Sequence, residues 1–258
     1  MLFFDFLIVA LLGLSFGSFA NVCINRLPYE FDIISPSRCP LCKTNINYYD
    51  NIPLLSYILL KGFARCCGKG ISIQYPIIEL VVMFFALSIY LYLGISLDAI
   101  LLFIFTLSLI IIFVTDFKEY IIPNSITYLF IIIGIVVTFI EVNPFNILII
   151  DSLLGGIISG VSFYTISKLF LIIRKKEGLG MGDVKLISMI GFWIGLEISL
   201  LIIVLSSFLG LIVAVFLIML KKIKYQQYLP YGCFISVATL VMGYVKISTN
   251  FNLYYLIN

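Results

Sequence analysis

Long apolar runs alternate with shorter polar segments along most of the chain, and this pattern predicts a bundle of membrane-spanning helices. A helix needs about 20 apolar residues to cross a bilayer. The runs predict eight spans, at residues 2–24, 76–95, 97–115, 125–141, 146–173, 184–196, 198–220 and 229–247. The sixth is short and the seventh follows it almost without a break around Glu197, so seven spans is an open alternative. The expected fold is an all-α polytopic membrane protein.

One polar segment, residues 25–75, is long enough to form a subdomain outside the membrane. It cannot bury a large core by itself, so we expect it to lean on the helix bundle or on a metal. The chain before it carries Asp5 and has no small-residue cleavage site before Cys23, which favours a retained first span over a removed signal peptide. The predicted organisation is a first transmembrane helix at 1–24, a cysteine-containing loop subdomain at 25–75 and a bundle at 76–258.

The composition supports the membrane assignment and narrows the possible chemistry. Hydrophobic residues make up 62% of the 258 residues and charged residues 11%, with a mean hydropathy of +1.19. The chain contains no histidine. This excludes histidine metal sites, Ser-His and Cys-His catalytic arrangements and histidine general bases. The basic residues are scattered through short loops, which gives no signature of nucleic-acid binding.

The basic residues predict the orientation in the membrane. All of the 16 lysines and arginines except Lys246 fall in or beside four polar segments, at residues 25–75, 116–124, 174–184 and 221–228. Because cytoplasmic loops carry the excess of Lys and Arg, we expect these segments to be cytosolic and both termini to lie outside. Asp116 and Asp183 then lie at the cytosolic edge of the bilayer.

These two acids stand beside residues that break helices. Asp116 ends the third apolar run shortly before Pro123, and Asp183 follows Gly180 and Gly182 in the stretch from 178 to Lys185. Each acid also has a purely structural interpretation. Asp116 would be a solvated residue where a helix leaves the membrane, and Asp183 would be the N-cap of the next helix.

The combination of the two acids favours a catalytic role. Two carboxyl groups held close together cannot both ionise cheaply, so one keeps a proton near neutral pH while the other acts as a base. Such a pair can activate water against an amide and protonate the leaving nitrogen. Glu79, just inside the second span, is one further candidate, either pairing with a basic residue or lining a polar cavity, whereas loop acids such as Asp50 are expected to be solvated.

Four of the six cysteines lie in the 25–75 segment. Cys39 and Cys42 have the spacing of one half of a zinc knuckle. The expected second half, another Cys-x-x-Cys, reads instead Ala64-Arg65-Cys66-Cys67, with two adjacent cysteines that would strain a tetrahedral site. A zinc site formed by Cys39, Cys42, Cys66 and Cys67 and a set of free thiols are both open interpretations. Cys23 and Cys233 are expected to be apolar packing residues.

Several of these motifs, in this order, resemble the bacterial type IV prepilin peptidases, which are membrane aspartic proteases that also act as N-methyltransferases. The resemblance runs nearly end to end. It rests on Gly17 to Val22, Arg26 to Pro28, Cys39 to Cys42, Asp50 to Pro53, Tyr75 to Glu79, Asp116 to Pro123, Gly180 to Leu186 and Pro230 to Gly232. Two departures from the family pattern are Ala64 and Asn124, which stands where the family often has aspartate.

The resemblance implies a function in type IV pilus assembly and protein secretion, at the bacterial cytoplasmic membrane. The substrate would be a prepilin or pseudopilin with a basic leader, cut on the cytosolic side by Asp116 and Asp183, with Gly180, Gly182 and Lys185 in the active-site loop. S-adenosylmethionine would serve a second activity, methylation of the new N-terminus, tied to the 25–75 segment, and zinc would be structural.

Three alternatives stay open at this stage. The first is a peptidase without methyl transfer. The second is a transporter or channel in which paired aspartates bind protons or cations, although carriers favour internal repeats and polar residues at the midplane. The third is an inactive scaffold whose loop docks pilus-assembly proteins.

Overall fold

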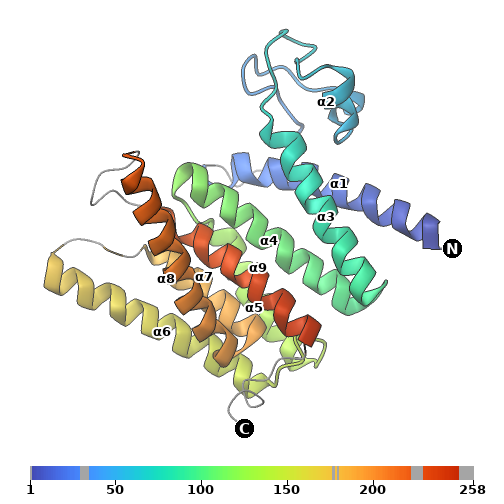
Figure 1. The fold of residues 1–258 in the computed structure, drawn as a ribbon. Helices are drawn as coiled ribbons and strands as arrows, with labels where there is room; N and C mark the ends of the chain where they lie inside the picture. The colour runs from blue at the N-terminus through green and yellow to red at the C-terminus, as the bar shows by residue number, and fades with distance from the viewer. Residues whose placement is uncertain (1, 30–34, 176–177, 179, 222–228, 250–258) are drawn as a thin grey trace. The chain divides into compact units, whose positions relative to one another are not determined.

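The computed structural model describes the chain except for residues 1, 30–34, 176–177, 179, 222–228 and 250–258. Lys176, Lys222 and Lys224, which contributed to the orientation argument, and both chain ends therefore lie outside the described residues. The described elements are α1 (Leu2–Arg26), η1 (Tyr48–Asn51), α2 (Leu55–Leu59), α3 (Gln74–Leu93), α4 (Leu97–Glu119), α5 (Asn124–Phe139), α6 (Ile149–Arg174), α7 (Met181–Ile194), α8 (Leu196–Met219) and α9 (Tyr231–Thr249) (Figure 1).

The protein is an all-α polytopic membrane protein, as the apolar runs predicted. Each of the eight runs coincides with one helix, namely α1 and α3 through to α9. Within the described residues, six of these helices are long and apolar enough to cross a membrane: α1, α3, α4, α6, α8 and α9. The other two are shorter, with 16 residues in α5 and 14 in α7. A helix of 14 residues extends only about 21 Å, less than the hydrocarbon thickness of about 30 Å.

The sixth and seventh runs form two separate helices. Gly195 ends α7 with φ +88°, a backbone conformation that glycine adopts without strain, and α8 begins directly after it. Glu197 lies in the first turn of α8 rather than between the two helices. The carboxylate of Asp151 accepts the N–H of Leu196 at 3.1 Å and so caps the start of α8.

The chain divides into two compact units, residues 1–111 and 112–258. In the first unit, α1 packs against α3 along small residues. A Cβ on Gly13 would lie 2.7 Å from the Cα of Met83, and one on Gly17 would lie 2.6 Å from the Cα of Glu79. The segment between α1 and α3 carries η1, α2 and two isolated antiparallel bridges, and no longer strand among its described residues.

In the second unit, α7 is the central helix and packs against α5, α6, α8 and α9 (Figure 1). Most of its apolar side chains are buried, Trp193 and Leu186 completely, whereas Met181 in its first turn is 50% exposed. The closest helix contact is between α6 and α7, where a Cβ on Gly155 would lie 2.5 Å from the carbonyl oxygen of Gly191. Packing against four other helices explains how a helix too short to span the bilayer is held in place.

The contact between α6 and α7 predicts a specific effect on stability. Gly155→Ala places a methyl group against the α7 backbone and is expected to destabilise the protein by about 1–3 kcal/mol through overpacking. Gly210→Ala is a matched control on α8, because its Cβ meets only the ring edge of Phe234, at 3.3 Å. Thermal unfolding in detergent measures both. Equal melting temperatures for the two variants would contradict the close crossing.

Candidate active site and cysteine cluster

Asp116 lies in the last turn of α4 with its side chain buried, at 5% exposure. Its Oδ2 accepts a hydrogen bond from the backbone N–H of Cys233 at 2.9 Å, and the N–H of Gly232 is a second donor to the carboxylate. Both donors belong to the first turn of α9, where unpaired N–H groups and the helix dipole stabilise a negative charge. The interpretation of Asp116 as a solvated helix end is therefore wrong.

Asp183 is the third residue of α7 and is also buried, at 8% exposure. Its Oδ2 accepts the N–H of Gly180, the residue before the helix, at 3.2 Å. Gly180 rather than Asp183 is thus the N-cap, and Asp183 closes the helix start from the third position. Leu179, within the same glycine-rich stretch, lies outside the described residues.

The structure brings these two acids together in the second unit. The negative charge of Asp116 acts directly on the Asp183 carboxyl group. Ile122 connects their surroundings, because a Cβ on Gly182 would lie 3.1 Å from the Cβ of Ile122 and one on Gly232 would lie 2.8 Å from its Cδ1. The first turns of α7 and α9 therefore both abut the short segment that follows α4.

The third residue assigned to the glycine-rich loop, Lys185, contacts the start of α5. Its Nζ lies 2.8 Å from Oδ1 of Asn124 and 5.1 Å from the ring centroid of Tyr128. With asparagine at position 124, this is a hydrogen bond to a neutral amide and a cation–π contact rather than an ion pair. Lys185 thereby connects α7 to α5 two residues beyond Asp183.

Two sequence expectations about other acids need correction, and one about a cysteine is confirmed. Asp50 is not solvated: its side chain is 11% exposed and accepts a bond from Arg65 at 3.1 Å. Glu79 forms no ion pair among the described residues and instead accepts a backbone N–H. Cys233 is buried, as expected, but its backbone also holds Asp116. The one sequence signal for the contact between Asp116 and Cys233 is Pro230, a helix-breaking residue directly before the last helix.

The cysteine-containing segment forms two arms with the same backbone structure, residues 38–45 and 63–70. Each arm is closed by one antiparallel bridge, between Arg38 and Asn45 and between Phe63 and Gly70. Equivalent backbone hydrogen bonds follow in each arm, joining Cys39 with Thr44 and Lys43 in the first and Ala64 with Lys69 and Gly68 in the second. The arms therefore superimpose in register, and Ala64 occupies the position of Cys39 while Cys67 occupies that of Cys42.

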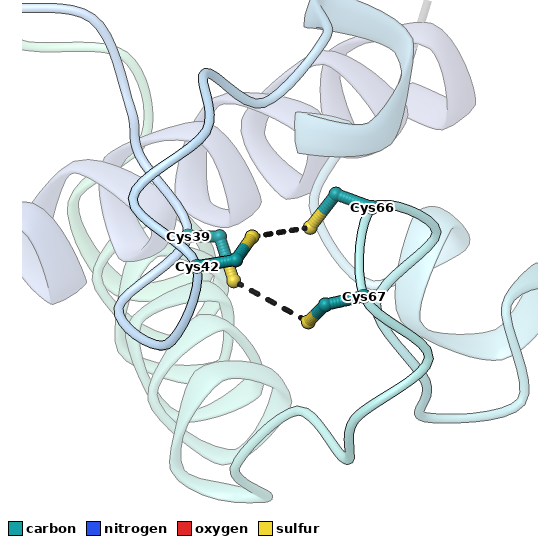
Figure 2. A group of neighbouring side chains, drawn as sticks. All are labelled: Cys39, Cys42, Cys66 and Cys67. Atoms are coloured by element: carbon teal, nitrogen blue, oxygen red, sulfur yellow. Dashed lines mark hydrogen bonds between the residues drawn. The ribbon is translucent and has the colours of Figure 1, made fainter.

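The four cysteines of the two arms gather into one cluster (Figure 2). Their sulfur atoms all lie within 4.8 Å of one another. The Sγ atoms of Cys39 and Cys67 are 3.9 Å apart, and those of Cys42 and Cys66 are 3.3 Å apart. Cys66 thus brings its sulfur to the cluster from a position next to Cys67, although Ala64 stands at the position equivalent to Cys39.

The local chemistry favours a thiolate at Cys42. The Thr44 hydroxyl, 2.9 Å from the Cys42 Sγ, and the Thr44 backbone lower the pKa of the Cys42 thiol to about 6, with a further contribution from Cys66. Thiolates are the form in which cysteines bind metals. Four cysteine sulfurs at this spacing are a ligand set typical of zinc, which is held tetrahedrally at about 2.3 Å.

Comparisons with known proteins agree with this division of the chain. Residues 11–93 match the family model described as the bacterial peptidase A24 N-terminal domain, and residues 103–215 match the type IV leader peptidase family. The cluster cysteines lie in the first match, and both buried aspartates lie in the second.

Full-length relatives are similar over most of the chain. The prepilin leader peptidase/N-methyltransferase of Vibrio cholerae is 32% identical, covering 92% of this chain and 95% of the relative. The proteins of the same name from Pseudomonas putida and Pseudomonas aeruginosa are 29% and 28% identical, with 90% and 88% of this chain covered and 87% and 86% of the relatives. No solved structure is significantly similar.

Proposed function

The chain belongs to the type IV leader peptidase family, and from that premise we propose that Asp116 and Asp183 are the catalytic pair that cleaves leaders from prepilin-like substrates. One observation carries the assignment. Carboxyl groups from two helices far apart in sequence are both buried within one unit, and glycines next to them, Gly182 and Gly232, lie against the same residue, Ile122. Burying two like charges is costly, so the pair is expected to share one proton, and such carboxyl pairs are typical of functional sites.

The pair works as one acid and one base. Because repulsion between close carboxylates opposes double ionisation, one carboxyl keeps its proton. The ionised carboxylate takes a proton from water, whose oxygen attacks the carbonyl carbon of the peptide bond. The protonated carboxyl supplies the proton that the leaving nitrogen needs when the C–N bond breaks. The products are a leader with a new carboxylate and a mature protein with a new amino group.

Membership of a peptidase family weighs against the transporter and scaffold alternatives. The position of the acids agrees, because both occupy terminal turns of their helices, Asp116 the last turn of α4 and Asp183 the first turn of α7. A proton or cation carrier would place its acids along the transport path at the midplane.

We propose that the protein resides in the bacterial cytoplasmic membrane with the aspartate pair and the 25–75 segment on the cytosolic side and both termini outside. The distribution of basic residues supports this orientation. Lys246 is the exception, and its positive charge is compensated locally. Its Nζ donates to the carbonyl oxygen of Ile194 at 2.8 Å, and the charges of Asp151 and Glu197 act on it. A cytosolic site suits a basic leader that remains inside.

The names of the relatives indicate a second activity, N-methylation with a donor of the S-adenosylmethionine type. We propose that the protein methylates the new N-terminus and that the cysteine-containing segment of the first unit takes part. The donor, when bound, supplies a methyl group activated by a positively charged sulfur. A peptidase without this activity is the alternative.

We propose that Cys39, Cys42, Cys66 and Cys67 hold a structural zinc ion. The sulfur spacing supports this, since four sulfurs around a tetrahedral zinc at about 2.3 Å lie about 3.8 Å apart. The Cys39–Cys67 distance of 3.9 Å is close to that value. The fourth sulfur, from Cys66, compensates for Ala64. Zinc would join the two arms, whose hydrogen-bonded turns alone bury little apolar surface.

The catalytic assignment predicts that Asp116→Asn and Asp183→Asn each lower the rate of leader cleavage by at least about 100-fold, because each removes an acid or base from the reaction. The double variant should be little slower than either single variant, since the groups act as a unit. Gel or mass analysis of a purified prepilin follows the rates. Asp50→Asn, a change of an acid in the other unit, is the control. If either active-site variant cleaves the prepilin at the wild-type rate, the catalytic assignment is wrong.

The contact between the Asp116 carboxylate and the first turn of α9 predicts the effect of substituting Gly232. A Cβ on Gly232 would lie 2.9 Å from Oδ2 of Asp116, so Gly232→Ala is expected to displace the carboxylate and slow cleavage by up to about 100-fold. Gly243→Ala on the same helix makes only ordinary contacts, with Phe145 at 3.5 Å and Ile194 at 4.0 Å, and should leave the rate unchanged. Comparable rates for the two variants would show that the α9 contact does not position the acid.

The zinc assignment predicts about one metal ion per purified chain by elemental analysis. Cys66→Ala should lose the ion. Adding Ala64→Cys to that variant should restore it, because position 64 is equivalent to position 39 in the other arm. Folded wild-type protein without metal would reject the zinc site. Zinc retained by Cys66→Ala alone would show instead that Cys66 is not a ligand.

A further inference from the structure

A strained turn in the cysteine-containing segment is held by a buried carboxylate on α3. Leu54 has φ +60° and ψ −48°, and the N–H of Leu55 donates to the carbonyl oxygen of Pro53 at 2.6 Å. This is a γ-turn with positive φ at its central residue, a rare and strained conformation for a leucine. Such a conformation persists only where surrounding contacts determine it.

The contact that determines it is a hydrogen bond from the backbone N–H of Leu54 to Oε2 of Glu79, at 2.7 Å. Glu79 is 5% exposed and also interacts with the Ser18 side chain of α1. Its backbone is fixed, because Gly17 of α1 lies directly against its Cα. Since a buried carboxylate is costly without hydrogen bonds, the carboxylate and the strained turn stabilise each other.

A continuous line of contacts leads from this turn to the cysteine cluster. The turn lies between η1 and α2. In η1, Asp50 pairs with Arg65 at 3.1 Å, and the Arg65 guanidinium lies 5.6 Å from the ring centroid of Tyr49. Arg65 directly precedes Cys66 in the second arm. The second arm is thereby connected through η1 and the turn to one carboxylate on a membrane helix.

We propose that Glu79 is a positioning residue for methyl transfer, which holds the cysteine-containing segment against α3 in its working conformation by fixing the Leu54 turn. The inference rests on the proposed function, in which this segment takes part in methylation. Glu79 lies in the first unit and the aspartate pair in the second, so its loss should affect methylation without affecting cleavage.

The experiment follows leader loss and methyl addition on one prepilin by mass spectrometry, with S-adenosylmethionine present. Glu79→Ala is expected to slow methyl transfer by about 100-fold, the cost of a misplaced site, while cleavage stays near the wild-type rate. Glu79→Gln should retain most methyl transfer, because its amide oxygen can accept the same N–H bond. Adding Leu54→Gly to Glu79→Ala should restore part of the activity, since glycine adopts positive φ without strain.

The possible outcomes separate this inference from the proposed function. Wild-type protein that cleaves but never methylates would overturn the proposed methyl transfer and, with it, this role of Glu79. If the wild type methylates, equal methylation by Glu79→Ala would overturn the inference alone. Parallel loss of cleavage and methylation in Glu79→Ala would also overturn it, because it would show that Glu79 only packs α1 against α3. Rescue by Leu54→Gly would support it, since a packing defect at Glu79 does not depend on the backbone of Leu54.

Discussion

The hydrogen bonds between the Asp116 carboxylate and the first turn of α9 are the interaction on which the proposed active site depends. A carboxylate buried in an apolar bundle needs hydrogen-bond donors that are fixed in place. The N–H groups at a helix N-terminus are such donors, and no side chain has to be ordered to supply them. The contact explains why residue 232 is glycine, because a side chain there would meet the carboxylate. It also fixes where α4 ends relative to α9.

The two units differ in how they combine apolar membrane helices with polar functional groups. The second unit buries its short helix α7 among four others and keeps its polar chemistry in helix-terminal turns. The first unit pairs two long helices through glycines and carries its polar chemistry on an irregular segment. That segment has little apolar core, and three contacts order it instead: the cysteine cluster, the Asp50–Arg65 pair and the Glu79–Leu54 bond. A protease and a methyltransferase can thus share one chain with separate supporting contacts.

Much of the fold could be predicted because apolar runs in a membrane protein determine where helices form. The helix positions follow from the runs, and Gly195 confirms that the sixth and seventh runs form separate helices. The meeting of Asp116 with Asp183 could only be inferred from their chemistry, since proximity depends on how the helices pack. The sequence does not reveal that Cys66 joins the cluster on equal terms with the other three cysteines. The equivalence of the two arms lies in their backbone hydrogen bonds and not in the spacing of the cysteines. The γ-turn at Leu54 has no sequence signal, since leucine rarely adopts it.

The most direct test of the account is intact-mass spectrometry of a prepilin incubated with the purified wild-type protein, first without and then with S-adenosylmethionine. We predict loss of the leader in both samples and one added methyl group on the mature product in the second alone. Cleavage that requires the methyl donor would contradict the separation of the two activities. An uncut prepilin in both samples, with folded protein, would contradict the central claim that the buried aspartates form a protease.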